Sequence, residues 1–194
     1  MKTKNSNKLN ILSFKTASAF EKWLAKNHDK VDGIWLRLFK KDSGEHSVTY
    51  KQAVDEALCY GWTDGQVKSY DEKSWIQKFT PRRSKSIWSK KNTENIDRLT
   101  SLGKMRPAGL AEVEKAKADG RWTKAYDSPG KMQMPADFIK QVSKHKSAKT
   151  FFESLNKTNK YAIAWRLQTA KKPETREKRM KAILEMLLKG EKFH

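Results

Sequence analysis

Residues 49–65 have the sequence TYKQAVDEALCYGWTDG, and this stretch joins the best-marked helix of the chain to a strand. Thr49 and Gln52 have the spacing of a capping box, which satisfies free backbone N–H groups at a helix start. Apolar side chains then recur every three or four residues, and Gly61 supplies the left-handed residue that commonly ends a helix. We therefore predict a helix over residues 49–60, followed directly by a strand.

Strand patterns lie on both sides of this helix. Residues 33–41, GIWLRLFKK, alternate between a fully apolar face and a partly apolar one, which is typical of a strand packed on one side. Two further strands are predicted at 62–69 and 74–80, joined by the short turn YDEK. A three-stranded antiparallel sheet is the simplest arrangement of the three segments.

Helical patterns fill most of the remaining chain. A helix is predicted over 16–28, where Ser18 and Glu21 have capping-box spacing. After Pro81 the apolar period is helical to the end of the chain. The segments predicted there are 89–102, 107–119 and 135–144, then two helices capped by Ser147 and Thr158 and a last helix that opens at Pro173.

These patterns predict an α+β fold in which a small three-stranded antiparallel sheet packs with helices and is followed by a helical C-terminal part. The polar residues 1–13 are expected to form a flexible N-terminus. Residues 14–130 are expected to form the α+β core, and residues 131–194 the helical part. The boundary is placed by the loop 121–134, which contains proline and glycine and separates the two patterns.

Charge is the next feature of the sequence. The 194 residues include 42 Lys and Arg and 22 Asp and Glu, which gives a net charge of +20. Residues 140–194 alone hold fifteen basic and five acidic side chains, net +10. Such a chain attracts nucleic acid and other polyanions at low salt. The single cysteine excludes an intrachain disulfide, and no signal peptide or membrane span is recognised, so we expect a cytoplasmic protein without membrane insertion.

A basic run, PRRSKSIWSKKN, occupies residues 81–92, between the last predicted strand and the next helix. Guanidinium groups fork onto phosphate or carboxylate, and a helix start at Ser89 would add backbone N–H donors. Trp88 could stack on a base or a sugar ring. The alternative is a solvated loop in which Ile87 and Trp88 hold the backbone to the core while the charges face water.

Two residues outside the run are expected to join it. Asp64, in the segment YGWTDG, is a candidate general base or a partner for an arginine, and the alternative is a turn aspartate that accepts backbone hydrogen bonds. Arg176 follows the apolar stripe of the last helix, so it needs a carboxylate such as Asp64 or a bound anion. The predicted anion-binding residues are Asp64, Arg82, Arg83, Ser86, Trp88, Ser89 and Arg176, with Trp62, Asn92, Arg106, Arg121, Trp122 and Arg179 as a second group.

Sequence motifs for metal or cofactor chemistry are absent. The four histidines are dispersed, and there is no C-x-x-C, H-E-x-x-H, phosphate loop or G-x-S-x-G elbow. Cys59 lies at the C-terminal end of its predicted helix, where the helix dipole does not favour a thiolate, so we expect a buried structural cysteine. We therefore expect no metal and no cofactor.

Three long strings resemble the YdeI/OmpD-associated family of bacterial proteins: ALCYGWTDG (57–65), FTPRRSKSIWSKKN (79–92) and GKMRPAGLAEVEKAKADGRW (103–122). The segments FEKWL, GIWLRLFKK and PETREKRMKAILEMLLKG are similar to that family as well. Thr63 stands where the family usually has isoleucine. The resemblance runs from about residue 14 to residue 190, and the last third is similar to the bacteriocin-protection segment. It implies a cytosolic α+β protein associated with bacteriocin protection, and it implies no particular reaction or catalytic residue.

These observations favour a non-enzymatic binding protein with an anion-accepting cleft between the sheet edge and the helical part. Its partner would be an anionic small molecule or an acidic partner. One alternative is nucleic-acid binding through the basic C-terminal helices, without sequence specificity. Another is an enzyme that acts on a phosphorylated or carboxylated small molecule with Asp64 as its base. The sequence favours binding over catalysis and leaves the oligomeric state open.

Overall fold

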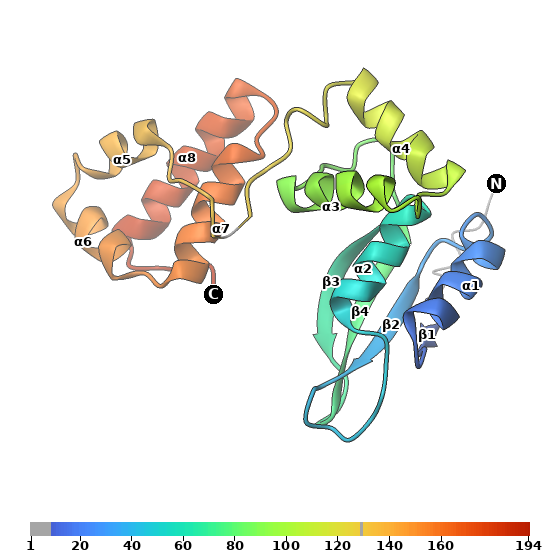
Figure 1. The fold of residues 1–194 in the computed structure, drawn as a ribbon. Coiled ribbons are helices and arrows are strands. Elements are labelled where there is room, and N and C mark those ends of the chain that lie inside the picture. The colour runs from blue at the N-terminus through green and yellow to red at the C-terminus, as the bar shows by residue number, and fades with distance from the viewer. Residues whose placement is uncertain (1–8, 129) are drawn as a thin grey trace, which may run out of the picture. The chain divides into compact units, whose positions relative to one another are not determined.

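A computed structural model describes residues 9–128 and 130–194, and Figure 1 shows its helices and strands. The chain forms two compact units. The first holds the residues up to Trp88 together with Asn92–Lys124, and the second holds Ser89–Lys91 and Ala125–His194. The chain passes finally from the first unit to the second at residues 124–125, ahead of the boundary at 130–131 that the sequence predicts.

The first unit is built on a four-stranded sheet with the order β1-β2-β4-β3. Strands β2 (Ile34–Phe39), β4 (Ser74–Pro81) and β3 (Trp62–Ser69) are antiparallel neighbours, as predicted. The prediction of only three strands is wrong, because β1 (Ile11–Leu12) pairs in parallel with β2. A two-residue strand carries no alternating pattern, so the sequence places it in the flexible N-terminus. Residues 1–8 of that segment lie outside the described residues.

Helices α1 (Ala17–Asn27) and α2 (Tyr50–Cys59) cover one face of this sheet, and α2 lies against β3 (Figure 1). The predicted capping box of α2 is confirmed. The backbone N–H of Gln52 donates to the Thr49 hydroxyl, and the backbone N–H of Thr49 donates to the Gln52 side chain. The core between helices and sheet is fully buried and includes Phe20, Leu24, Leu36, Leu38, Ala53, Ala57 and Phe79.

The N-cap residues of three helices lie two residues before the predicted ones. Helix α1 is capped by Thr16, whose hydroxyl accepts from the N–H of Ala19 at 3.1 Å, so Ser18 lies inside the helix. Helix α7 (Lys157–Gln168) is capped by Asn156 instead of Thr158, and α6 (Lys146–Ser154) begins after His145 instead of at Ser147. In α1 and α7 an upstream side chain already satisfies a free N–H group, so the later hydroxyl is not needed as a cap.

Helices α3 (Lys90–Ser101) and α4 (Pro107–Ala118) follow β4, and both were predicted. Helix α4 packs on the end of α2 at a glycine. The backbone N–H of Arg106 donates to the Cys59 carbonyl at 3.1 Å, and a Cβ added to Gly109 would lie 2.3 Å from the same oxygen. Gly109 is therefore required by the close approach of two helices.

The second unit consists of α5 (Ala136–Val142), α6, α7 and α8 (Pro173–Leu188), where α8 opens at the predicted proline. Helices α6 and α8 lie side by side (Figure 1). Within the residues that the structure describes, none of the helices combines the length and the hydropathy that a membrane crossing requires. The buried core of the unit is made by Phe138, Val142, Ala148, Leu155, Ile163, Leu167, Ile183 and Leu187.

Candidate functional site

The basic run after β4 closes into a tight turn. The backbone N–H of Arg83 donates to the Ser86 hydroxyl at 3.0 Å, and the backbone N–H of Ser86 donates to the Arg83 carbonyl at 2.9 Å. Ser84 and Lys85 form the tip between them, and residues 83–85 are all exposed. The reciprocal hydrogen bonds fix the shape of this basic turn, which we define as residues 83–86.

Arg82 and Trp88 form the buried base of the basic turn. Arg82 is only 7% exposed, and its guanidinium lies 3.5 Å from the centre of the Trp88 ring, a cation–π distance. Trp88 is 1% exposed and packs on Trp122, with ring centres 5.1 Å apart. Trp88 is therefore an anchor inside the first unit, and the ring is not presented for stacking on a base or a sugar.

Two arginines from different elements hold the backbone where the basic turn ends, at Ser86 and at the following Ile87. Arg82 donates to the Ile87 carbonyl at 3.3 Å. Arg121, which follows α4, donates to the neighbouring Ser86 carbonyl at 2.9 Å and is itself held by the Asp119 carboxylate at 2.7 and 2.8 Å. Because the Arg121 side chain is only 10% exposed, its guanidinium stabilises the loop and is not presented to solvent as a binding group.

The tip of the basic turn carries two exposed cations, Arg83 and Lys85. No Asp or Glu occurs between residues 73 and 93 of the sequence. Arg83 and Lys85 are exposed, and none of the ion pairs among the described residues uses either side chain. A guanidinium such as that of Arg83 forms bidentate hydrogen bonds with planar anions, whereas the Lys85 ammonium is a compact point charge. The two groups can therefore bind the same anion in different ways. The turn can therefore receive a carboxylate or a phosphate group without breaking an existing ion pair.

Asp64 lies at the start of β3, next to a β-bulge that shifts the register between Asp64 and Val67. The bulge agrees with the glycine at position 65, whose carbonyl accepts from the Gln77 side chain at 2.8 Å. The Asp64 carboxylate accepts from the Tyr50 hydroxyl at 2.6 Å. The expected pairing of Asp64 with an arginine is thus replaced by a tyrosine, which the sequence pattern assigns to the apolar stripe of its helix.

Cys59 is buried near the end of α2, as predicted. Burial raises the pKa of its thiol to about 11, and the nearby Glu56 carboxylate acts in the same direction. The group is therefore a neutral thiol at physiological pH. A thiolate is the reactive form of cysteine, so the environment of Cys59 suits a structural residue.

Glu21 gathers two polar groups that the sequence does not connect. Its carboxylate accepts from the Tyr60 hydroxyl at 2.6 Å and pairs with Arg106 at 3.2 Å. Burial, followed by the hydrogen bond to Glu21, raises the pKa of Tyr60 to about 12. Arg106 is thus placed at a structural contact of α4 with α1 instead of at the basic turn.

Two other residues of the second predicted group, Trp62 and Asn92, belong to the core and to a helix start. Trp62 is buried, and its indole N–H donates to the His28 carbonyl at 3.0 Å. Asn92 lies in the first turn of α3. Trp62 is therefore a core residue and is not available as part of a surface site.

In the second unit, Arg176 of α8 donates to both oxygens of Asp137 on α5. These hydrogen bonds lower the pKa of the Asp137 carboxyl. Arg179 donates to the Arg166 carbonyl at 2.7 Å, and Ser89 pairs through its backbone with Tyr126. The sequence predicts either a carboxylate such as Asp64 or a bound anion as the partner of Arg176. In the structure the partner is a carboxylate, that of Asp137.

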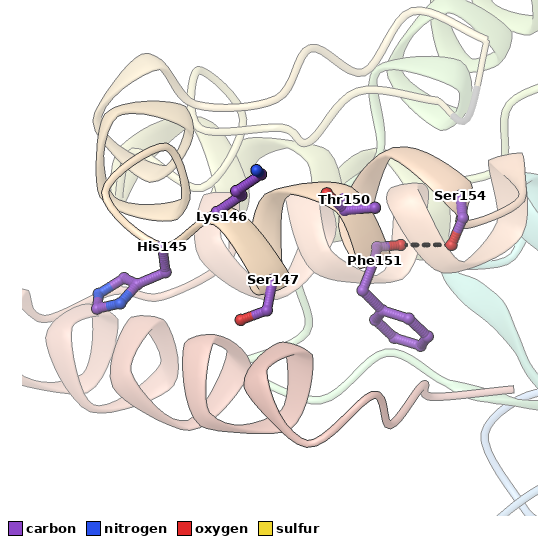
Figure 2. A pocket seen from close by; sticks show the side chains of 6 residues that line it. All are labelled: His145, Lys146, Ser147, Thr150, Phe151 and Ser154. Carbon is purple, nitrogen blue, oxygen red and sulfur yellow. Dashed lines mark hydrogen bonds between the residues drawn. The ribbon is translucent and has the colours of Figure 1, made fainter.

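A pocket of about 810 Å³ lies along α6, and Figure 2 shows its lining side chains. No Asp or Glu lines it, so its polar groups are an imidazole, an amine and hydroxyls. The Ser154 hydroxyl already donates to the Phe151 carbonyl at 2.7 Å. Among the described residues, no three His, Cys, Asp or Glu side chains gather as metal ligands would. The pocket is lined by His145, Lys146, Ser147, Thr150, Phe151 and Ser154.

Comparison with protein families assigns the two units separately. Residues 12–112, more than half of the 194-residue chain, match a family described as a domain of unknown function (DUF8412). The chain belongs to the DUF8412 family. Residues 131–190 match the family described as bacteriocin-protection, YdeI or OmpD-associated, which confirms the resemblance over this segment, whereas the part of the resemblance before residue 131 is not matched by that family. Neither the curated proteins nor the solved structures contain a match to the chain.

The basic turn of this DUF8412 member therefore lies inside the matched segment 12–112, whereas Arg176 lies in the segment matched to the YdeI/OmpD-associated family. The sequence indicates the charged residues but not their partners. Asp119, Tyr50 and Asp137 carry no motif, and only their positions in space make them partners of Arg121, Asp64 and Arg176.

Proposed function

We propose that the chain is a non-enzymatic binding protein of the cytoplasm whose first unit receives an anionic group of a partner at the basic turn. The observation that carries this proposal is the pair of arginines, Arg82 and Arg121, that hold adjacent carbonyls of the loop. The backbone is thereby organised before a ligand arrives, which lowers the entropy that binding must remove. Arg83 and Lys85 remain as exposed cations on that fixed backbone.

The chemistry of the first unit favours binding over catalysis. The Cys59 thiol is buried with a raised pKa, so it is a poor nucleophile. Asp64 is held by Tyr50, which is a stable arrangement for a carboxylate and does not by itself create a base. The description bacteriocin-protection of the family matched by residues 131–190 is compatible with a protein that acts by binding.

Titration with inorganic phosphate at about 0.15 M salt, where charges more than about 8 Å apart are largely screened, tests this proposal, with backbone N–H resonances of residues 83–87 as the readout. The double variant Arg83→Gln/Lys85→Gln should weaken binding by about tenfold, because charge-assisted hydrogen bonds are lost. The control variant Lys26→Gln/Lys30→Gln removes the same charge from exposed positions elsewhere in the first unit. Its affinity should stay within about twofold of the wild type if long-range charge is screened.

Equal weakening in both double variants would reduce the binding to general charge attraction and contradict the proposal. A parallel titration with a single-stranded oligonucleotide addresses the nucleic-acid alternative. Binding that survives the loss of Arg83 and Lys85 but falls steeply with salt would assign the polyanion to the basic residues of 140–194 instead.

A further inference from the structure

The second unit contains an apolar groove that includes none of the predicted site residues. We define it by the segment that precedes α5 and by helices α5, α6 and α7, and its volume is about 390 Å³. Its apolar lining includes Met132, Met134, Ile139 and Phe152. Ile139 remains 40% exposed, although this apolar side chain belongs to a helix that packs on the core. The groove therefore leaves apolar surface open to solvent.

The methionines give this groove an adaptable lining. Met132 and Met134 are partly buried and lie in the segment that leads into α5. Methionine is unbranched and polarizable, so it fits varied partner shapes and is frequent on surfaces that bind peptides. The lining thus suits an apolar side chain of a partner better than a small molecule that needs several fixed polar contacts.

Two lysines form the polar rim of the groove. Lys160 donates to the Glu153 carbonyl at 2.8 Å and lies 5.6 Å from the Phe152 ring, so its amine is held above the apolar lining. Lys157 is the first residue of α7, where no acidic residue occupies the first turn. The positive end of the helix dipole adds to the lysine charge at this position. No carboxylate lines the groove.

We propose that this groove docks an acidic amphipathic segment of a partner protein. A large apolar side chain of the partner fills the space beside Met132, Met134 and Ile139, and flanking carboxylates pair with Lys157 and Lys160. The charge of the unit is complementary to such a segment, since residues 140–194 carry a net +10.

Charge also argues against two other possible ligands of the groove, a second copy of the chain and the N-terminal residues 1–8. A second copy of the chain carries a net +20 and would be repelled at long range. Residues 1–8 contain three lysines and no acidic residue, so they do not complement the lysine rim. The proposal does not rest on the basic turn, because the groove and the turn belong to different units.

The test selects binders from a displayed library of random 16-residue peptides against the full chain at physiological salt. We expect enriched peptides that combine Asp or Glu with Leu, Phe or Trp. The variant Ile139→Glu should weaken the best peptide by about tenfold or more, because it places a charge at the apolar centre of the contact. The separate variant Lys157→Glu should also weaken binding of the acidic peptide, through like-charge repulsion.

Matched controls separate the groove from general charge. Leu188→Glu makes the same change at an apolar residue that is 45% exposed on α8, and Lys171→Glu reverses an exposed charge outside the groove. Both should retain binding within about twofold. The proposal is overturned if no peptide is enriched, if acidic peptides without apolar residues bind equally well, or if the controls lose as much as Ile139→Glu. A concentration-dependent dimer that Ile139→Glu abolishes would assign the groove to a second copy and overturn it as well.

Discussion

The contact of α4 with α2 at Gly109 permits a prediction whose sign follows from geometry. In the variant Gly109→Ala, the new Cβ would lie 2.3 Å from the Cys59 carbonyl oxygen and 2.8 Å from the Leu58 carbonyl oxygen. Both neighbours are backbone atoms, so neither can rotate away as a flexible side chain would. The Cys59 carbonyl also accepts from the Arg106 N–H, so a movement of α4 disturbs that hydrogen bond too.

Two opposing contributions determine how far Gly109→Ala changes the free energy of unfolding. Alanine favours a helix interior over glycine by about 1 kcal/mol. Restoring an ordinary contact requires α4 to move from α2 by about 1 Å, and overpacking of this kind costs about 1–3 kcal/mol. Because a 2.3 Å contact with backbone lies at the severe end of that range, we expect a net loss of about 2 kcal/mol in the free energy of unfolding of the first unit.

Urea unfolding followed by tryptophan fluorescence measures this loss, since Trp62 and Trp88 are buried in the first unit. The variant Ala111→Gly measures the difference in helix propensity between alanine and glycine, because Ala111 is exposed within the same helix. Its free energy of unfolding should fall by about 1 kcal/mol through helix propensity alone. If Gly109→Ala proves as stable as the wild type or more stable, the close approach of α4 and α2 does not limit the residue at this position, and the reasoning fails.

Three further outcomes follow from the same contacts. Trp88→Ala should destabilise the first unit by about 3–5 kcal/mol in urea unfolding, because it removes a buried ring against which Trp122 and Arg82 pack. A thiol reagent should label Cys59 very slowly at neutral pH in the folded chain and rapidly in urea, because its pKa is raised to about 11. The pKa of Asp137 is lowered in the folded state, so at acid pH the unfolded chain binds more protons than the folded chain. The stabilisation by this carboxylate is therefore complete above about pH 4, the pKa of an unperturbed Asp. It is lost as the pH falls through the lowered pKa of the folded state. Thermal unfolding of Asp137→Asn should therefore differ from the wild type at neutral pH and converge with it in acid.

Much of the fold could be predicted because its signals are local. The capping box of Thr49 and Gln52 involves residues three apart, and the alternation in β2 is contained within six residues. Strand β1 was missed because Ile11 and Leu12 are a strand only through their pairing with β2. The helix caps at 16 and 156 were missed because several nearby polar residues can cap, and the tertiary position of the helix decides among them.

The candidate site was predicted less completely than the fold. The residue types of the basic run indicated charge and an anchor. They did not indicate that Arg82 packs on Trp88, or that Trp88 packs on Trp122, which follows α4 in the chain. For Arg176, the apolar stripe correctly indicated the need for a partner, yet the identity of Asp137 follows from the packing of α5 on α8. Partners of charged groups are set by tertiary contacts, which composition and spacing do not encode.

Strand β3 is one of the two edge strands of the sheet formed by the described residues, and its outer backbone groups are a template on which another chain could add a strand. The bulge between Asp64 and Val67 interrupts the regular ladder there, and Lys68 places a charge beside the exposed Val67. Irregular and charged edges resist intermolecular pairing. We therefore expect the bulge beside Asp64 and the charge of Lys68 to disfavour edge-to-edge pairing of β3 with another chain.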